Sequence, residues 1–318
     1  MLPDPTTSLS GRRMLVTGAS GFIGARLCRR AVEAGAIIHG VSRAPRGEAD
    51  GVHWEQGDLT DEAVVRDLVR RVQPEVVVHL ASEVGGGRGL DLVLPMLRAN
   101  LLAAVNLMLA CAEAGRPRVV LAGSMEEPDL GDAGAVAQSP YAVAKWGALA
   151  YARHFQALHA LPVVHLRVFM VYGPGQRDLR KLVPYVTTSL LRGEAPQLTS
   201  GARAVDWIYV DDVVDAFLRA AVTAGAAGRS LDVGSGELVT TRTLVERLAD
   251  VVAGDVSPAF GAIADRPHER VRQADPAAAA EALGWSARTP LAEGLERTVA
   301  FYRSEFERLG GRELRSSK

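Results

Sequence analysis

Short apolar runs alternate along this chain with longer segments whose apolar positions recur at helical spacing. Apolar runs of this kind are typical of strands buried on both faces, and the alternation predicts an α/β fold with a doubly wound parallel sheet. The expected strands are Arg13–Thr17, Ile37–Ser42, Val76–Ala81, Val119–Gly123 and Val163–Phe169. The expected helices are Phe22–Ala34, Asp61–Val72, Leu90–Ala114 and Pro140–His159.

The pattern loosens after Val171, and the rest of the chain is expected to form a smaller α/β lobe. Its expected elements are a helix near Leu182–Arg192, a strand Ser230–Val233, a helix from Thr241, a helical Pro276–Leu283 and a final helix over 290–309. We therefore assign residues 11–169 and about 206–236 to the sheet domain. Residues of about 170–205 and 237–318 are assigned to the smaller lobe.

Composition excludes several classes of protein. The net charge of −1 over 318 residues gives no electrostatic footprint for nucleic acid or for an anionic membrane. Two cysteines, Cys28 and Cys111, provide neither a disulfide framework nor a zinc site, so we expect buried thiols, no metal and a cytoplasmic location. No signal peptide is recognised near the N-terminus, and no uninterrupted apolar run is long enough to span a membrane.

A glycine-rich segment, Thr17–Gly24, lies between the first expected strand and the first expected helix. In this context Gly18 permits a tight turn, Gly21 lets a pyrophosphate approach the backbone, and Gly24 lets the helix pack closely on the strand. The helix would then direct its free N–H groups and positive dipole end at the phosphates. A plain glycine-rich turn is the alternative. The placement favours a Rossmann-type dinucleotide site.

Tyr141 and Lys145 stand at i and i+4 on an expected helix, so both side chains share one face. An ammonium beside a phenol favours the phenolate, and we expect the pKa of Tyr141 to fall towards neutrality. Ser124 ends the fourth strand and could hydrogen-bond the oxygen that Tyr141 protonates. Taken singly, these residues favour the simpler interpretation of a surface aromatic, a solvated lysine and a turn serine.

Taken together, these motifs resemble the extended short-chain dehydrogenase/reductase superfamily, in particular its nucleotide-sugar epimerases, dehydratases and reductases. The resemblance extends from about Arg12 to Tyr302. Its markers are Thr17–Gly24, Gly57-Asp58-Leu59, His79-Leu80-Ala81, Asn100, Ser124, Tyr141 with Lys145, Val171–Gln176, Tyr209–Val213 and Val233–Gly236. The resemblance implies that the sheet domain binds NAD(P) and that the smaller lobe binds substrate.

The resemblance also implies hydride transfer between a sugar carbon and a nicotinamide. Ser124 and Tyr141 would hold the sugar oxygen, while Lys145 would tune Tyr141 and hold the nicotinamide ribose. Asp58 and Leu59 would lie beside the adenine, and Asn100 would fix a main-chain turn near the cofactor. The implied cofactor-binding residues are Gly18, Ser20, Gly21, Phe22, Ile23, Gly24, Ser42, Arg43, Asp58, Leu59, Leu80, Ala81, Ser82, Asn100, Tyr141, Lys145 and Val168.

The end of the second strand bears on cofactor choice. NAD-specific folds usually place an acid there to accept a hydrogen bond from the adenosine 2′-hydroxyl. This chain has Ser42-Arg43 instead, and an arginine would pair with a 2′-phosphate. We therefore expect NADP(H) to be preferred over NAD(H). The alternative is that Arg43 only stacks on the adenine and either cofactor binds.

The residues after Ser124 bear on the reaction. Glucose-type 4,6-dehydratases resembling this chain have an Asp–Glu pair there, whereas this chain has Met125-Glu126, and Glu126 is either a base or a solvated loop acid. The leading hypothesis is an NADPH-dependent reductase of a nucleoside-diphosphate 4-keto-(6-deoxy)hexose. The alternative is a 4-epimerase or 4,6-dehydratase that retains NAD(P). A catalytically silent dinucleotide sensor is a minor alternative.

Two departures from the resemblance concern the substrate. Met170 replaces an asparagine, and Val205 replaces an arginine, that usually contact the diphosphate. The residues expected to bind substrate are Glu83, Met125, Met170, Arg203 and Arg266. By resemblance, a homodimer is expected to form through the helices 90–114 and 140–159.

Overall fold

The computed structural model describes residues 8–47, 50–129, 134–265 and 271–309. The chain divides into two compact units. Unit 1 comprises residues 1–168, 214–233 and 277–285, and unit 2 comprises residues 169–213, 234–276 and 286–318.

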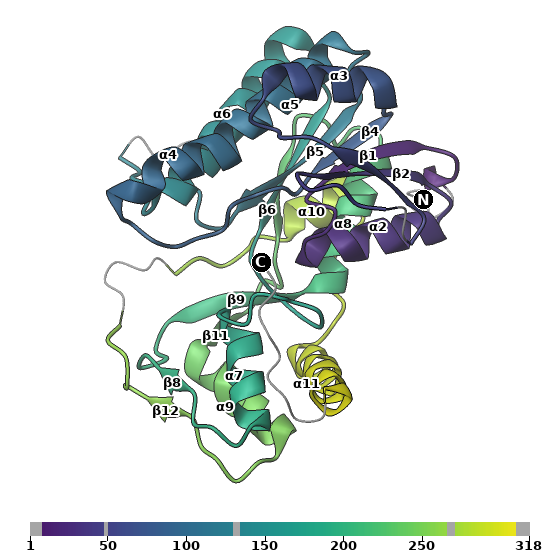
Figure 1. Ribbon diagram of the computed structural model, residues 1–318. Coiled ribbons are helices and arrows are strands. Elements are labelled where there is room, and N and C mark those ends of the chain that lie inside the picture. The colour runs from purple at the N-terminus through teal and green to yellow at the C-terminus, as the bar shows by residue number, and fades with distance from the viewer. Residues whose placement is uncertain (1–7, 48–49, 130–133, 266–270, 310–318) are drawn as a thin grey trace. The chain divides into compact units, whose positions relative to one another are not determined.

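Unit 1 contains a seven-stranded sheet in the order β10-β6-β5-β4-β1-β2-β3, and each adjacent pair is parallel (Figure 1). Its strands are β1 (Arg13–Thr17), β2 (Ile37–Ser42), β3 (Val52–Gln56), β4 (Val76–His79), β5 (Arg118–Ser124), β6 (Val163–Val168) and β10 (Ser230–Val233). The strand order reverses between β1 and β4, and ligands of open α/β sheets bind beyond the carboxyl ends of the strands at such a point. The expected doubly wound sheet is confirmed.

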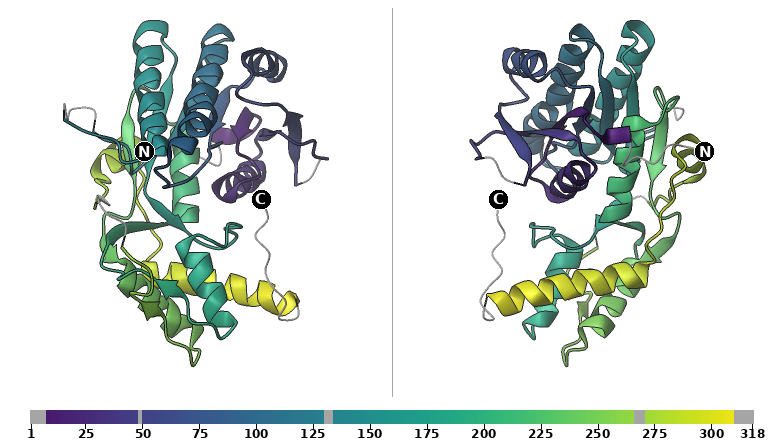
Figure 2. Two further views of the ribbon diagram at one scale, coloured as in Figure 1. Left: turned by 60° about the vertical axis from the view of Figure 1, so that its left-hand side comes forward. Right: turned by 90° about the vertical axis from the view of Figure 1, so that its right-hand side faces the viewer.

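Helices cover both faces of this sheet, with α3, α5 and α6 on one side and α2, α8 and α10 on the other (Figure 1). Figure 2 shows α5 and α6 running side by side. The helices are α2 (Phe22–Glu33), α3 (Glu62–Val72), α5 (Ala103–Glu113), α6 (Pro140–His159), α8 (Val210–Val222) and α10 (Ala277–Leu283). Cys28 in α2 and Cys111 in α5 are free, buried thiols, and burial raises the pKa of each to about 12.

The sheet face under α3, α5 and α6 changes character along its strands. At its amino-terminal end it buries an apolar cluster that includes Leu15, Val77, Val119 and Val163. Because side chains alternate along a strand, the next residues on the same face are Thr17, His79 and His165, and on β5, where Leu121 pairs with both histidines, Gly123 follows two residues later. We call these four positions the polar end of the face. All three of its side chains are at most 2% exposed.

The segment 90–113 is helical throughout but is not the single α-helix expected. It consists of a 3₁₀ turn (Leu90–Leu92), α4 (Val93–Met96), a π-helical segment (Leu97–Leu102) and α5. Pro95 lacks an N–H group to donate within the first turns, and the π segment surrounds Asn100. In the described ranges, this helical segment alone has the length and mean hydropathy, 1.7, to cross a membrane, a test that buried helices of globular proteins also pass.

Unit 2 has a three-stranded sheet in the order β11-β9-β7, and a separate strand pair, β8 and β12. Its helices α7, α9 and α11 pack against one another, and α11 is the long yellow helix of Figure 2. The elements are β7 (Met170–Tyr172), α7 (Leu182–Leu191), β8 (Gln197–Leu198), β9 (Ala204–Tyr209), β11 (Leu238–Thr240), α9 (Thr241–Val252), β12 (Ala259–Phe260) and α11 (Leu291–Arg308).

The boundaries of the units differ from those expected at two places. Residues 206–213 belong to unit 2, because β9 pairs with β7 and β11 rather than with the large sheet. Residues 277–285 belong to unit 1, because α10 packs against β10.

Candidate active site

Tyr141 and Lys145 lie in the first turns of α6, where the sequence fixes the start of the helix. Ser139 is the N-cap and its Oγ accepts a hydrogen bond from Ala142 N at 3.1 Å, while Pro140 occupies the first turn. This start places both side chains on one helix face, as their spacing predicts. They are 8% and 4% exposed, so both are buried within unit 1.

Lys145 reaches the end of β5. Its Nζ donates a hydrogen bond to Ala122 O at 3.0 Å and lies 5.9 Å from the centroid of the Tyr141 ring. Burial lowers the pKa of Lys145 to about 8, against the opposing effect of the Glu127 carboxylate. The ammonium is therefore buried beside the phenol.

Ser124 completes this group at the last position of β5. Its Oγ accepts a hydrogen bond from Glu126 N at 3.2 Å, and its hydroxyl is also hydrogen-bonded to Tyr141. Residues from β5 and from α6 thus converge at the carboxyl edge of the sheet. The structure brings Ser124, Tyr141 and Lys145 together, the arrangement in which a phenol can exchange a proton with a substrate oxygen.

The expected direction of the Tyr141 pKa is wrong for the protein alone. Burial raises the pKa of Tyr141 above its ordinary value, and the carboxylates of Glu126 and Glu127 raise it further. Hydrogen bonds from Ser124 and Ser82 act in the opposite direction but do not outweigh burial. The expected decrease in the Tyr141 pKa was based on the spacing of Tyr141 and Lys145. That spacing does not show how deeply the phenol is buried.

The turn between β1 and α2 has the geometry of a dinucleotide cradle. Gly18 has φ +68°, and a Cβ there would lie 2.7 Å from Ala81 N; a Cβ at Gly24 would lie 2.1 Å from Gly18 O. Gly21, the N-cap of α2, has no side-chain cap, so N–H groups of the first turn stay available. These residues fit the pyrophosphate of NAD(P), with Ser20, Phe22 and Ile23 in the same turn.

The expected adenine end lies at the tips of β2 and β3. Asp58 Oδ1 accepts hydrogen bonds from Thr60 N at 2.9 Å and Thr60 Oγ1 at 2.8 Å. These bonds, and the charge of Arg43, lower the pKa of Asp58. Arg43 is exposed, Ser42 half-buried, and the carbonyl of Leu59 accepts a hydrogen bond from Asn106.

Asn100 fixes the main chain after β4, as expected. Its Oδ1 accepts hydrogen bonds from Ser82 Oγ at 2.7 Å and Glu83 N at 3.0 Å, and its Nδ2 donates to Glu83 O at 3.0 Å. Thr17 Oγ1 accepts from Ala81 N at 3.2 Å. The segment Leu80–Glu83 is therefore held next to the glycine turn.

The expected substrate residues do not form one group within a single unit. Glu83 and Met125 belong to unit 1, and Met125 is buried, with its N donating to Val168 O at 3.0 Å. Met170 and Arg203 belong to unit 2. Arg266 lies outside the described residues.

Residues 14–234 of the chain match the model of the NAD dependent epimerase/dehydratase family. The chain belongs to this family. It is 32% identical to a UDP-glucose 4-epimerase of Mycolicibacterium smegmatis, over 92% of this chain and 99% of the relative. It is 31% identical to a dTDP-glucose 4,6-dehydratase of Mycobacterium tuberculosis, over 92% and 93% of the two chains.

A solved structure, MoeE5 in complex with UDP-glucose and NAD, superposes with a TM-score of 0.81. It shares 32% sequence identity, and the match covers 92% of this chain and 99% of MoeE5. The members of this epimerase/dehydratase family are NAD-dependent oxidoreductase-type enzymes. The expected family and enzyme class are therefore confirmed, and the relatives favour the epimerase or dehydratase alternative over the reductase.

Two buried carboxylates of this family member were missed by sequence reasoning. In unit 2, Asp206 accepts hydrogen bonds from Ser235 N, Ser235 Oγ, Gly236 N and Ala274 N at 2.7 to 3.0 Å, and so joins three segments of the chain. In unit 1, Glu127 is 1% exposed and contacts Ser124. A glutamate directly after a candidate base gave no sequence signal of burial.

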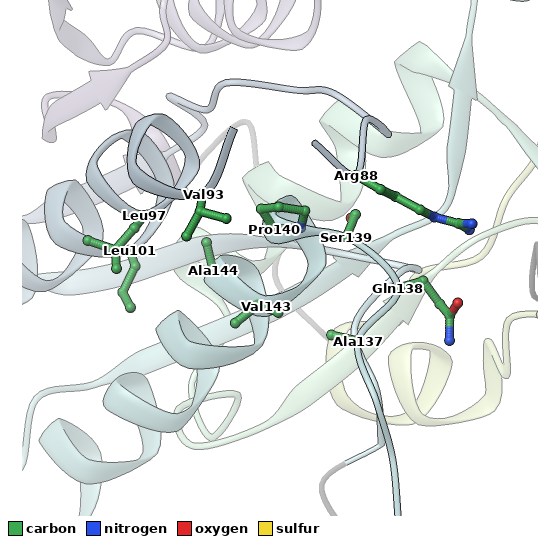
Figure 3. A pocket seen from close by; sticks show the side chains of 10 residues that line it. All are labelled: Arg88, Val93, Leu97, Leu101, Ala137, Gln138, Ser139, Pro140, Val143 and Ala144. Carbon is green, nitrogen blue, oxygen red and sulfur yellow. The ribbon is translucent and has the colours of Figure 1, made fainter. Parts of the chain in front are cut away.

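A pocket of about 330 Å³ opens beside the start of α6, between α6 and the segment that contains α4 and the π turn (Figure 3). Arg88 and Gln138 lie at one end, and Leu97 and Leu101 at the other (Figure 3). Ser139, which lines the pocket, also donates a hydrogen bond to Glu126 Oε2 at 3.2 Å. Most of the lining is apolar, in contrast to the charged group around Tyr141.

Proposed function

We propose that the protein is an NAD(P)-dependent 4-epimerase of a nucleoside-diphosphate hexose. The observation that carries this proposal is that Ser124, Tyr141 and Lys145 form a buried group. The residue directly after Ser124 is Met125 and not a carboxylic acid. An epimerase needs one acid–base residue at one sugar oxygen. The likeness to a UDP-glucose 4-epimerase supports a UDP-sugar as the substrate.

Bound NAD(P) would supply a reversible hydride acceptor, and this chain would hold it by the Gly18–Gly24 turn and by Lys145. Tyr141 would remove the proton from the sugar hydroxyl as the carbon is oxidised. It would return the proton to the ketone oxygen after the keto sugar has rotated to present its opposite face. Ser124 would hold the same oxygen by a hydrogen bond throughout. The Lys145 ammonium would stabilise the phenolate form of Tyr141 during the exchange.

A 4,6-dehydratase is the second candidate, and the position of Glu126 favours it. Glu126 is exposed, its charge acts on Tyr141, and Ser139 Oγ donates to its Oε2 at 3.2 Å. A base is needed near the same sugar to remove the C5 proton. Glu126 would serve as that base.

One experiment separates the candidates. The purified enzyme is incubated in D₂O with UDP-glucose or dTDP-glucose, and the products are analysed by NMR. An epimerase gives the C4 epimer without deuterium at C5, whereas a dehydratase gives a 4-keto-6-deoxy sugar that carries deuterium. A product formed only with added NADPH and a 4-keto sugar would contradict both and restore the reductase. Glu126→Gln is the matched variant, because it should abolish dehydration, whereas an epimerase should still form its product in that variant.

For the cofactor, we propose that Arg43 pairs with the 2′-phosphate of NADP(H), so that NADP(H) binds more tightly than NAD(H). Ser42-Arg43 at the end of β2 lacks the acid typical of NAD sites and supports this. Calorimetry should show that Arg43→Ala weakens NADP⁺ by about tenfold and NAD⁺ little. Arg70→Ala is the matched control, because Arg70 is an exposed arginine in the last turn of α3, outside the segment Ser42-Arg43. Equal losses for both cofactors in Arg43→Ala would contradict the proposal.

We also propose that the protein is a homodimer whose interface is formed by the segment 90–113 and by α6. These elements expose large apolar side chains: Leu90, Val93, Leu94, Leu97 and Leu102 on the first and Val143, Tyr151 and Leu158 on the second. Large exposed apolar side chains on two neighbouring elements are typical of a protein interface. Ala148 of α6, by contrast, is buried in the core and lies outside this interface. Sedimentation should show a dimer that Leu94→Glu converts to a monomer, while Leu238→Glu on unit 2 does not.

A further inference from the structure

A buried carboxylate–imidazole pair lies at the polar end of the sheet face, and the chemistry above does not use it. Glu127 and His165 are 1% and 2% exposed. Glu127 Oε2 lies 3.2 Å from His165 Nε2, and His165 Nδ1 lies 2.7 Å from Ser230 Oγ. A chain of polar groups therefore extends from the loop after β5 across β6 to β10.

The pair occupies the space left by a missing side chain. Gly123 lies on the sheet face that His165 shares, and a Cβ there would lie 2.0 Å from His165 Nε2 and 2.7 Å from Glu127 Oε1. Real atoms do not approach so closely. A glycine at position 123 is thus required for both side chains to be buried as they are.

Glu127 also holds the backbone of Ser124. Glu127 Oε1 accepts a hydrogen bond from Ser124 N at 2.7 Å, and Glu127 N donates to Ser124 O at 3.0 Å. Both main-chain polar groups of Ser124 are therefore bonded to one residue. The position of the Ser124 hydroxyl at the end of β5 depends on this turn.

The charge of Glu127 reaches the other members of the group. Burial opposes ionisation of Glu127, but His165, the Ser124 N–H and Lys145 together lower its pKa, so the carboxylate is charged. Its charge raises the pKa values of both Lys145 and Tyr141. Lys145 in turn helps to lower the pKa of His79, while Ser82, Ser124 and Glu126 also act on the pKa of Tyr141.

We propose that Glu127, braced by His165, is a positioning residue that holds Ser124 in place and is the buried counter-charge of the Lys145 ammonium. The inference rests on the proposed acid–base role of Tyr141 and Lys145. It adds a residue for which the resemblance gave no role, at a position where many family members instead begin a Val-Tyr-Gly-like triplet. It also accounts for Gly123 and for the otherwise unused His165.

The test is the pH dependence of kcat/KM in Glu127→Gln. The amide keeps the size of the side chain and an oxygen for Ser124 N but removes the charge. Since that charge raises the pKa values of both Tyr141 and Lys145, its loss should move both limbs of the profile to lower pH, by about one unit. A purely structural role would lower the whole profile without moving its limbs.

Asp129→Asn is the matched control. It makes the same chemical change on the same segment, but Asp129 is 65% exposed in its side chain and pairs with Arg167 at 3.4 Å rather than contacting Ser124. Its limbs should coincide with those of the wild type. A Glu127→Gln profile with unmoved limbs, or an equal displacement in Asp129→Asn, would overturn the proposal.

If Glu127→Gln does not fold, Glu127→Asp tests the positioning role, because it retains the charge but withdraws it from Ser124 N. We expect kcat to fall by about tenfold, with KM and both limbs unchanged. A wild-type kcat in Glu127→Asp would contradict the inference. Tyr141→Phe distinguishes this failure from failure of the proposed function: undiminished turnover there refutes the acid–base assignment itself, whatever Glu127 does.

Discussion

On the sheet face under α3, α5 and α6, one end buries only apolar side chains, whereas the other, two residues along the same strands, buries Thr17, His79 and His165. The strands and the covering helices are the same at both ends. Only the chemistry of the buried groups differs. The apolar end has no proton to exchange, whereas the polar end adjoins Lys145, whose charge acts on His79, and Glu127, which pairs with His165.

The difference shows how a region that stabilises the fold offsets the free-energy cost of a region that buries polar groups. Burying a charged or polar group is unfavourable unless it is paired, and burying apolar area is favourable. Lys145 of α6 is buried beside the polar end, close enough for its charge to act on His79, and its own pKa is lowered to about 8 because burial disfavours its ammonium. The free energy to hold it there comes from clusters such as that around Leu107 and Met108. The two ends should therefore respond in opposite ways to substitution.

The largest effect is expected at the polar end, from Tyr141→Phe. Removal of the hydroxyl eliminates the proton exchange, and kcat should fall by about 10³-fold. The melting temperature should change little, because the ring keeps its packing. Steady-state kinetics and calorimetry on the same preparation give both numbers. A variant that has lost stability in proportion to its activity would remove the distinction between the two ends.

Leu107→Ala is the corresponding change at the apolar end. Leu107 is 1% exposed in the core cluster, and its truncation should lower the free energy of unfolding by about 3 kcal/mol. Activity per folded molecule should stay close to that of the wild type. Urea denaturation measures the loss. Val136→Ala, at a residue that is 66% exposed and lies outside the proposed dimer interface, should cost less than about 0.5 kcal/mol and is the control.

Lys145→Met should separate activity from stability in one variant. It removes the buried ammonium, so kcat should fall by about 10²-fold. Because burial disfavours that charge in the folded protein, the melting temperature should equal or exceed that of the wild type. Differential scanning calorimetry at pH 7 is the measurement. A lower melting temperature would show that the hydrogen bond to Ala122 O stabilises the fold more than desolvation opposes it.

The smallest effect, when it is counted per pH unit, is expected from His79→Gln, in the pH dependence of stability. Burial, with the charge of Lys145, lowers the pKa of His79 to about 3, so the folded state binds no proton there until well below the ordinary pKa of 6.5. The unfolded state binds one earlier, and stability falls as pH decreases from 6.5 to 3. The variant should reduce this slope by up to about 1.4 kcal/mol per pH unit. His53→Gln, at an exposed site, should not.

Much of the fold could be predicted because its signals are local. The strands β1, β2 and β10 and the helix α6 have the expected bounds, since apolar runs and the Ser139-Pro140 helix start are written in adjacent residues. The helix α8 and the strands β3 and β9 were not predicted. The strand β3 alternates apolar and polar residues at the sheet edge, and β9 pairs only with distant segments of unit 2.

The parts of the site that lie within a local sequence motif could be predicted. The spacing of Tyr141 and Lys145, and the glycines of the turn, each lie within one element and its boundary. The contacts of Glu127 depend on His165 and Ser230, which are remote in sequence, and on the hole at Gly123. Such contacts require the register of β5 on β6 and of β6 on β10, which no local pattern specifies.

That hole has a consequence for how the protein can vary. A methyl group at position 123 would collide with two partners at once, and loss of either partner would leave the other ionised or polar in a dry interior. Positions 123, 127 and 165 are therefore expected to vary together in evolution. A lineage that abandons one of the three must replace the other two almost simultaneously, or pass through ancestors that fold poorly.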